Sequence, residues 1–195
     1  MTQPAYSTRF DEAVALAVSS FRHIYRKGSG APYVTHLLAV TAIVGENGGD
    51  EDQMCAAILH DYMEDVPDAN EATLRAQFGD RVVDIVIALS DTLEQPKPPW
   101  QARKEAYLAT LATKSADVKL VSAADKLHNC SCTVQNLRAK GLSTFDLFNG
   151  KREGTLWYYR QIVEKLSTGW SHPLLDRLSA EVDAMHAETE RLLAG

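Results

Sequence analysis

The sequence has few features that would direct the chain to a membrane or to an oxidising compartment. Its 195 residues include only three cysteines, an odd number that does not suit a framework of disulfide bonds. No apolar run approaches the ~20 residues that a membrane-spanning helix needs. Residues 1–8 have neither the basic nor the apolar region of a signal peptide. We therefore expect a cytoplasmic protein with reduced thiols.

The chain also lacks an excess of basic residues. It has 20 lysines and arginines against 26 acidic residues, which gives a formal net charge of −6. A general nucleic-acid binder or a membrane-surface binder would show the opposite balance. We expect neither nucleic acid nor membrane as a partner. A small anionic ligand stays compatible with this charge, because it needs only a local positive patch or a metal ion.

Several common catalytic motifs are missing. There is no phosphate-binding loop ending in Gly-Lys-Ser or Gly-Lys-Thr, and no serine lies in a nucleophile-elbow pattern. The pair of glycines at Gly28 and Gly30 is too short for a dinucleotide fingerprint. Cys130 and Cys132 are close enough to suggest a metal site, but we interpret them as free thiols that are buried or half-buried.

What the sequence does contain is a helical pattern along almost all of its length. Apolar residues recur at spacings of three and four, and no segment reads convincingly as a strand. The β-branched run from Val82 to Leu89 is the strongest candidate for a strand, yet its length favours a buried helix. The predicted helices begin near Thr8, Thr35, Asp50, Glu71, Val82, Pro99, Ser115, Leu156 and Pro173.

Local signals place some helix ends more closely. Thr8 followed by Asp11 predicts a capping box for the first helix, whose apolar spacing continues to Ile24. Asp50 predicts the N-cap of a helix that runs through Asp61. Residues 141–154 are expected to be irregular. The last helix is expected to pack either on the domain or on a second subunit, so a homodimer is an open alternative.

The strongest chemical signal is the run His60-Asp61-Tyr62-Met63-Glu64-Asp65, which follows the apolar residues 56–59. In a helix, His60 and Glu64 would share one face, as would Asp61 and Asp65. Three carboxylates so close together repel one another unless a cation or a shared proton relieves them. A solvated helix end is the ordinary alternative, but unpaired charge directly after a buried run is costly. We therefore favour a bound divalent metal.

Two further residues complete a plausible set of metal ligands. His36 opens an apolar helix, where a lone histidine is more often a core or capping residue. Asp125 lies within the apolar stretch 120–129, where its ordinary partner would be Lys126 or a neighbouring helix. Only together with the histidine–aspartate pair do these residues make a set of two imidazoles and two carboxylates, which suits a harder metal than a thiolate site would.

The order of these motifs resembles the HD-domain metal-dependent phosphohydrolases. Residues 26–36 look like the R-K-x-x-G-x-P-Y-x-x-H signature of the RelA/SpoT-type hydrolases of guanosine tetra- and pentaphosphate. Residues 60–65 are similar to the H-D-x-x-E-D motif of that family, and residues 124–129 to its A-D-K-L-x-N motif. The resemblance implies an all-α, single HD-domain helical bundle over residues 1–195, with a motif core of about 10–161 and an extra C-terminal helix of about 173–193. The chain length leads us to expect the small stand-alone form.

The resemblance also implies roles for individual residues. The family holds one Mn²⁺ ion, and its ligands correspond to His36, His60, Asp61 and Asp125 of this sequence. The family residues that position and deprotonate the attacking water correspond to Glu64 and Asp65. The implied reaction removes the 3′-pyrophosphate of a (p)ppGpp-like nucleotide, giving GDP or GTP and pyrophosphate. The implied substrate-binding residues are Arg26, Lys27, Asn129 and, with a looser match, Lys151; Arg152 is a weaker candidate.

Some positions depart from the family pattern. Phe21 and Ile24 stand where the family often has His and Gln, and Ser131 replaces a frequent Arg. These departures leave the predicted metal site intact but keep the nucleotide base open. A second hypothesis is therefore another HD phosphohydrolase, acting on adenosine-type alarmones or as a 5′-nucleotidase. A third, a non-catalytic nucleotide sensor, fits poorly because every predicted ligand and both acids are present.

Overall fold

The helical spacing of the sequence is realised along most of the described chain. The computed structural model describes residues 6–94 and 96–195, and within them it contains helices and no strand. Only an isolated antiparallel bridge joins Tyr25 and Pro32. The all-α prediction is confirmed. No helix in these two described stretches combines the length and the apolar character that crossing a membrane requires.

The chain divides into two compact units, Met1–Leu93 and Glu94–Gly195. We call them unit 1 and unit 2 and describe each by itself. Unit 1 contains the helices α1 (Thr8–Ser20), α2 (Val34–Glu46), α3 (Glu51–Leu59), α4 (Tyr62–Asp65), α5 (Glu71–Phe78) and α6 (Asp80–Leu89). The single-domain organisation stays a prediction.

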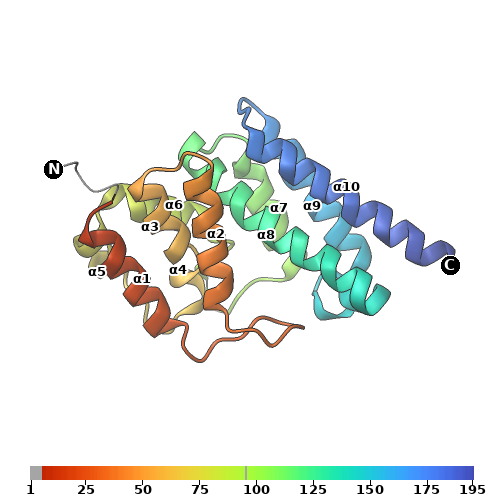
Figure 1. Ribbon diagram of the computed structural model, residues 1–195. Helices are drawn as coiled ribbons and strands as arrows, with labels where there is room; N and C mark the ends of the chain where they lie inside the picture. Colours follow the sequence, from red (N-terminus) through yellow and green to blue (C-terminus); the bar gives the residue numbers. More distant parts are fainter. Residues whose placement is uncertain (1–5, 95) are drawn as a thin grey trace. The chain divides into compact units, whose positions relative to one another are not determined.

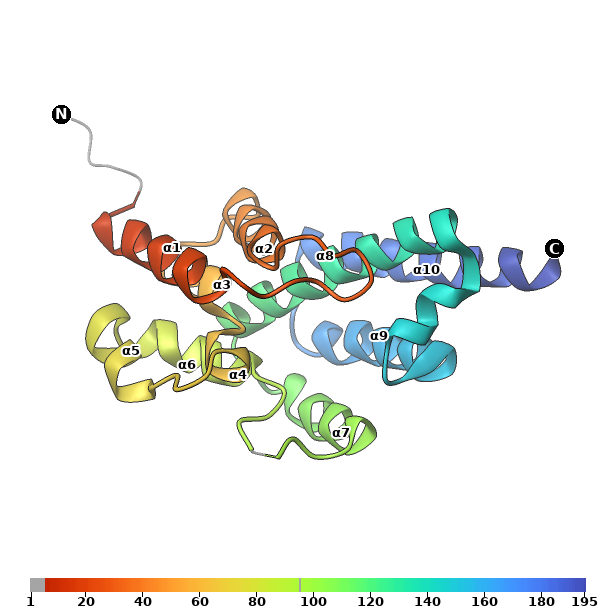
Figure 2. The ribbon, with the colours of Figure 1, turned by 90° about the horizontal axis from the view of Figure 1, so that it is seen from below.

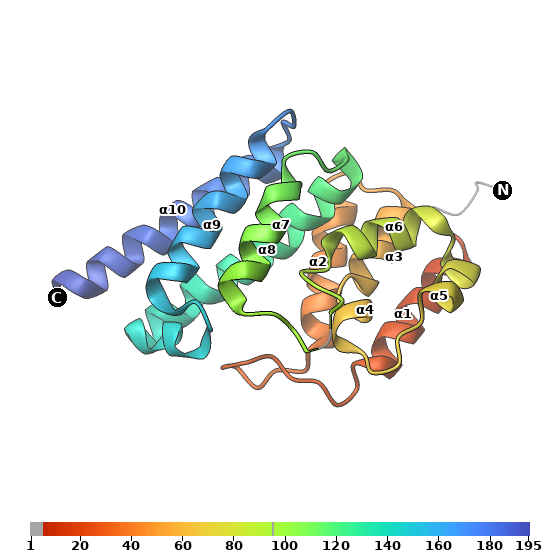
Figure 3. The same cartoon turned by 180° about the vertical axis from the view of Figure 1, so that it is seen from behind.

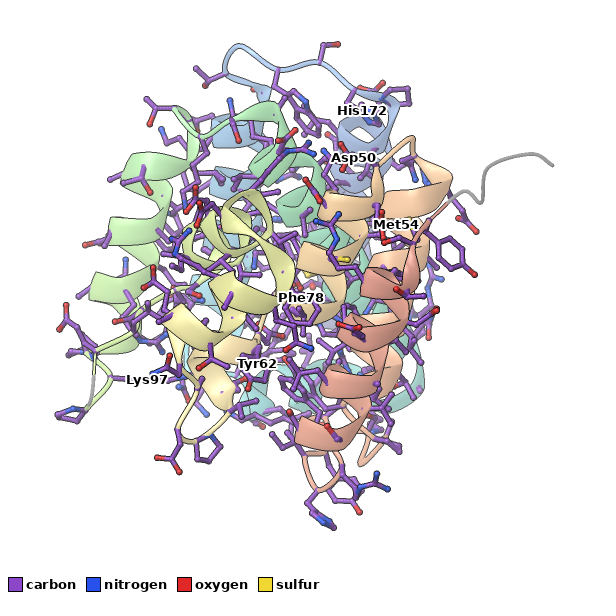
Figure 4. The ribbon with its side chains drawn as sticks, turned by 90° about the vertical axis from the view of Figure 1, so that its left-hand side faces the viewer. Asp50, Met54, Tyr62, Phe78, Lys97 and His172 are labelled. Carbon is purple, nitrogen blue, oxygen red and sulfur yellow. The ribbon has the colours of Figure 1, made fainter. Side chains whose placement is uncertain are left out.

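Helix α3 is the centre of unit 1. It contacts α1, α2 and α6, and Figure 1 shows it among them. Its residues 55–59 are completely buried. Phe78, at the end of α5, is also buried and lies in the interior of the unit (Figure 4). Apolar burial is the main favourable term in folding, so the buried α3 gives the residues that follow it a fixed position in unit 1.

The direction of α3 follows from its N-terminal cap. The Asp50 carboxylate accepts a hydrogen bond from the Gln53 backbone N–H, and the Gln53 side chain accepts one from the Asp50 N–H, which makes the capping box. The predicted cap at Asp50 is thus confirmed. Figure 4 shows Asp50 and Met54 near one end of the unit and Tyr62, which follows α3, near the other. The helix therefore carries His60 and Asp61 to the end opposite its cap.

Unit 2 is built around a long helix. It contains α7 (Trp100–Leu111), α8 (Ala116–Lys140), the 3₁₀ helix η1 (Gly141–Leu147), α9 (Lys151–Ser167) and α10 (Pro173–Ala194). Helix α8 contacts α9, α10 and η1, and α7 contacts α9 (Figures 2 and 3). The Ser115 side chain caps α8 by accepting from the Val118 backbone N–H, and the helix begins near Ser115, as the sequence predicts.

Four local predictions are wrong. The first helix is capped by Ser7 rather than Thr8, because the Ser7 hydroxyl accepts from the Arg9 N–H. That helix ends at Ser20, and Phe21 follows it in a turn. Helix α3 ends at Leu59 and does not run through Asp61. Residues 141–154 are not irregular, because burial of Thr144 and Phe145 accompanies a 3₁₀ helix there and α9 begins at Lys151.

Candidate metal centre

The end of α3 presents His60 in a defined orientation. His60 follows the helix with nearly helical backbone angles and is only 4% exposed. Its Nδ1 lies 2.7 Å from the carbonyl oxygen of Ala57. A carbonyl oxygen can only accept, so Nδ1 carries a proton, and when the ring is neutral its Nε2 presents a lone pair. This is the arrangement that a metal-binding histidine requires, with its second nitrogen fixed by a backbone carbonyl.

His36 comes to the same place from a different helix. It lies in the first turn of α2, is 1% exposed, and its ring centroid is 5.1 Å from that of His60. Because α2 packs on α3, residues 24 positions apart in the sequence become neighbours. The structure therefore brings together the two predicted imidazole ligands within unit 1.

The carboxylate of Asp61 completes this group. Its Oδ2 lies 3.0 Å from Nε2 of His60 and 3.9 Å from Nε2 of His36. A carboxylate oxygen and an unprotonated imidazole nitrogen both carry lone pairs, so close approach requires a proton or a cation between them. Two imidazoles and a carboxylate are donors that suit a divalent metal. His36 and His60 are among the residues that could hold a metal ion, which suggests a divalent metal.

Tyr33 is a functional candidate that the sequence analysis did not identify. Its hydroxyl donates to Oδ2 of Asp61 at 2.6 Å. The tyrosine directly precedes α2, three residues before His36. Its place in the Pro-Tyr pair of the first motif was the available signal, but spacing alone does not show what a hydroxyl contacts 28 residues further along the chain.

The two predicted water-activating acids lie just beyond the metal group. Glu64 and Asp65 belong to the short helix α4, which follows Asp61. One carboxylate oxygen of Glu64 accepts from the Asp91 backbone N–H at 3.1 Å, and Glu64 is half-buried, whereas Asp65 is exposed. The structure thus holds Glu64 against the chain that leaves α6, while the side chain of Asp65 faces solvent.

Arg26 and Lys27 lie in the loop between α1 and α2. The loop is closed by hydrogen bonds from Arg26 N to the Ala31 carbonyl at 2.8 Å and from Tyr33 N to the Ile24 carbonyl at 2.9 Å. Arg26 is half-buried and Lys27 is exposed. These two cations precede Tyr33 by seven and six positions in the chain.

In unit 2, Asp125 is buried on α8 and both of its oxygens accept hydrogen bonds. Lys126 Nζ lies 2.5 Å from Oδ2, and the Asn129 amide donates to Oδ1 at 2.6 Å. Although burial disfavours the charged ammonium, the neighbouring Asp125 carboxylate raises the pKa of Lys126 well above its usual range. The ordinary partner expected for this aspartate, Lys126, is therefore present. Asn129, predicted to contact substrate, here orients Asp125.

Lys151 lies at a shallow pocket within unit 2. The pocket is lined by Trp100, Gln101, Asn149, Gly150, Lys151, Arg152, Glu153 and Gly154. Larger residues would not fit at Gly150 and Gly154, because a Cβ at Gly150 would come within 2.6 Å of the Trp100 ring and one at Gly154 within 3.0 Å. Lys151 is exposed, and its Nζ donates to the Asp146 carbonyl at 3.1 Å.

The cysteines take no part in the metal group. All three are free; Cys55 and Cys130 are buried and Cys132 is half-buried, as expected. Burial raises the pKa of the Cys55 thiol to about 11 and raises that of Cys130 further. Protonated thiols are poor metal ligands, so the buried side chains of Cys55 and Cys130 are structural.

Comparison with known families agrees with the motif order. A model described as an HD domain matches residues 13–156. The chain belongs to the HD domain family. The match includes the first-motif histidine, the histidine–aspartate pair, the two acids that follow it and Asp125.

Curated relatives point to one branch of this family. A guanosine-3′,5′-bis(diphosphate) 3′-pyrophosphohydrolase from Haemophilus influenzae is 34% identical over 109 residues, which are 53% of this chain and 16% of that protein. A probable enzyme of the same name from Synechocystis is 30% identical over 157 residues, 76% of this chain and 20% of that protein. The chain spans about a fifth or less of the length of these relatives.

A solved structure extends the likeness over nearly the whole chain. It was described as a metazoan ortholog of SpoT that hydrolyses ppGpp and plays a role in starvation responses. The two are 26% identical with a TM-score of 0.76, and the match covers 94% of this chain and 97% of that one. The resemblance to the RelA/SpoT hydrolase type is therefore confirmed.

Proposed function

We propose that this chain is a metal-dependent phosphohydrolase that removes the 3′-pyrophosphate from guanosine 3′,5′-bis(diphosphate) and its pentaphosphate. Water is consumed, and the products are GDP or GTP and pyrophosphate. The observation that carries the proposal is the approach of His60 Nε2 to Asp61 Oδ2 at 3.0 Å, with His36 beside them. The names of the relatives supply the substrate class, and they do not favour the adenosine or 5′-nucleotidase alternative.

The proposed metal is Mn²⁺, with His36, His60 and Asp61 as ligands and Asp125 added by the sequence motif as the fourth. Such an ion would polarise the phosphoryl group that water attacks. Glu64 is the proposed base that takes the proton of the water, and Asp65 helps to orient that water. The backbone N–H of Asp91 holds one Glu64 oxygen, which limits the directions in which the carboxylate can turn.

Substrate binding requires positive charge on a chain with a net charge of −6. Arg26 and Lys27 are proposed to contact the base and phosphates, and Lys151 to contact a phosphate. Asn129 is proposed to contact the nucleotide as well. An amide carries two N–H groups and an acceptor oxygen, so its bond to Asp125 is compatible with this role.

Product analysis tests the proposal directly. The metal-free chain, the Mn²⁺-loaded chain and a chelator-treated loaded sample would each be incubated with guanosine 3′,5′-bis(diphosphate), its adenosine counterpart and nucleoside monophosphates. Ion-exchange chromatography would separate the products. We expect GDP and pyrophosphate only in the Mn²⁺-loaded sample. Orthophosphate from monophosphates, with the tetraphosphate intact, would overturn the proposal and select the nucleotidase reading.

A further inference from the structure

The hydroxyl of Tyr33 makes a direct contact with the metal group that no motif assigns to it. It donates to Asp61 Oδ2 at 2.6 Å, and the same oxygen faces Nε2 of His60 at 3.0 Å. A carboxylate oxygen has two lone pairs, so one can accept from the phenol while the other is directed elsewhere. The phenol is neutral and does not cancel the negative charge that attracts a cation.

The aromatic ring that carries this hydroxyl is held on two sides. It stacks on Phe21 with 5.4 Å between ring centroids and 15° between planes, and Phe21 is completely buried. Its other contact is the edge of the His36 ring, at 5.6 Å and 77°. Offset-stacked and edge-on arrangements are the favoured geometries of aromatic rings, so these neighbours restrict where the phenol can point.

The backbone of Tyr33 is held as firmly as its ring. Its N–H donates to the Ile24 carbonyl at 2.9 Å, and its carbonyl accepts from the His36 N–H at 2.9 Å. One bond ties the residue to the start of the loop, and the other ties it to the first turn of α2. The position of the hydroxyl is therefore set before any ligand arrives.

We propose that Tyr33 is a positioning residue for the metal centre, and that Phe21 supports it through the ring stack. Tyr33 holds the Asp61 carboxylate in the orientation that directs Oδ2 towards the two histidine rings. Without this bond the carboxylate would rotate about its side-chain torsions, and binding a cation would include the entropy cost of ordering it. The inference rests on the proposed function only in requiring a cation at these ligands.

The test compares Tyr33→Phe with the unchanged chain in their metal-free forms. The substitution deletes the hydroxyl and keeps the ring for Phe21 and His36. Partners that orient metal ligands are typically worth about 10- to 100-fold in metal affinity, and we expect a weakening in that range by isothermal titration with Mn²⁺. Tyr25→Phe is the matched control, because Tyr25 lies in the same loop and is 61% exposed; we expect its affinity to be unchanged.

Two further measurements separate positioning from packing. The absorption spectrum of the Co²⁺-loaded protein reports the coordination geometry, and we expect Tyr33→Phe to alter it, whereas a packing role would alter only the melting temperature. Phe21→Leu keeps the hydroxyl and should weaken Mn²⁺ binding less than Tyr33→Phe does. Equal Mn²⁺ affinity in Tyr33→Phe and the unchanged chain would overturn the inference. Absence of Mn²⁺ binding by the unchanged chain would instead overturn the proposed function.

Discussion

The carboxylate of Glu64 accepts a hydrogen bond from the backbone N–H of Asp91 at 3.1 Å. This bond joins the short helix α4 to the segment that leaves α6, and α4 and α6 are in contact. It orients an acid that stands three residues after Asp61. A backbone N–H only donates a hydrogen bond and cannot itself take a proton from water. The bond is therefore compatible with Glu64 acting as a general base.

Replacing Glu64 by Gln should separate chemistry from metal binding. The Gln carbonyl can still accept from the Asp91 N–H, but an amide cannot take a proton from water. We expect Mn²⁺ content to be retained and single-turnover hydrolysis of guanosine 3′,5′-bis(diphosphate) to fall by about 10²- to 10⁴-fold. Glu190→Gln, at an exposed position of α10, serves as the control. A Glu64→Gln rate equal to that of the control would remove Glu64 from the mechanism.

Replacing Asp61 by Ala should remove the metal itself. The substitution deletes the oxygen that faces both histidine rings, and with it the negative charge that Asp61 offers a divalent cation. We expect the purified variant to retain less than about a tenth of the Mn²⁺ of the unchanged chain, because loss of even a residue that supports a metal ligand typically lowers metal affinity by about 10- to 100-fold. Elemental analysis after dialysis measures it. Asp11→Ala, exposed on α1, should keep its metal, and full metal content in Asp61→Ala would refute the ligand assignment.

Lys114 predicts a dependence of stability on pH. Burial, and then the charge of Lys126, lower the pKa of Lys114 to about 8 from 10.5. The folded state therefore binds the proton less tightly than the unfolded state does, and the charged lysine destabilises the fold fully below pH 8. As pH rises from 8 to 10.5 this cost disappears.

The matching experiment uses Lys114→Met, which keeps the length of the side chain and removes the titration. Its melting temperature should exceed that of the unchanged chain at pH 7, and the difference should shrink as pH approaches 10.5. Lys114 Nζ lies 4.3 Å from the centroid of the Tyr107 ring. This contact stabilises the charged lysine and so reduces the expected difference in melting temperature. A difference in melting temperature that stays constant between pH 7 and pH 10.5 would show that the burial of the ammonium does not matter.

Lys119 predicts a stability effect within unit 2. Its buried ammonium donates to the Ala112 carbonyl at 2.8 Å and to the Thr168 carbonyl at 2.6 Å, at the ends of α7 and α9. Lys119→Met would fill the space but leave both carbonyls without this donor. An unsatisfied buried polar group costs about 1–3 kcal/mol, so we expect the free energy of unfolding to fall by about that amount or more.

Urea denaturation of Lys119→Met measures this loss. Lys140→Met is a suitable comparison because Lys140 is exposed at the end of the same helix. Surface substitutions usually change stability by less than about 0.5 kcal/mol. Equal losses in the two variants would mean that the bonds between Lys119 and the two carbonyls contribute nothing specific.

The sequence predicted helices well wherever the signals were local. The Asp50 cap, the helix start near Ser115 and the helix Glu71–Phe78 all depend on residues close together in the sequence, and all three are present. The failures arose where two local signals competed or where distant contacts decided. Ser7 and Thr8 are both good caps, and Ser7 also donates from its hydroxyl and its backbone N–H to Glu51, 44 residues away, which favours the earlier start.

The break after α3 shows the same limit at the candidate site. Helical spacing predicted a continuous helix through Asp61, but the backbone of Asp61 leaves the helical region, with φ −97° and ψ 2°. The side chain of Asp61 then accepts a hydrogen bond from Tyr33 and faces His36, and both contacts depend on how α2 packs against α3. Residue spacing along one helix contains no information about a neighbour that arrives from another.

By itself, the sequence determined the helical class and predicted the ligand types, because periodicity, capping and motif order are read from the sequence alone. It named His36, His60 and Asp61, which the structure shows close together in unit 1, and Asp125; the assignment of all four as metal ligands stays a prediction. Tertiary structure alone decided that the Tyr33 hydroxyl donates to Asp61, that the Asp91 N–H donates to Glu64 and that Lys119 donates to the Thr168 carbonyl. These contacts join residues 27 to 49 positions apart, and only the packing of helices brings such residues together.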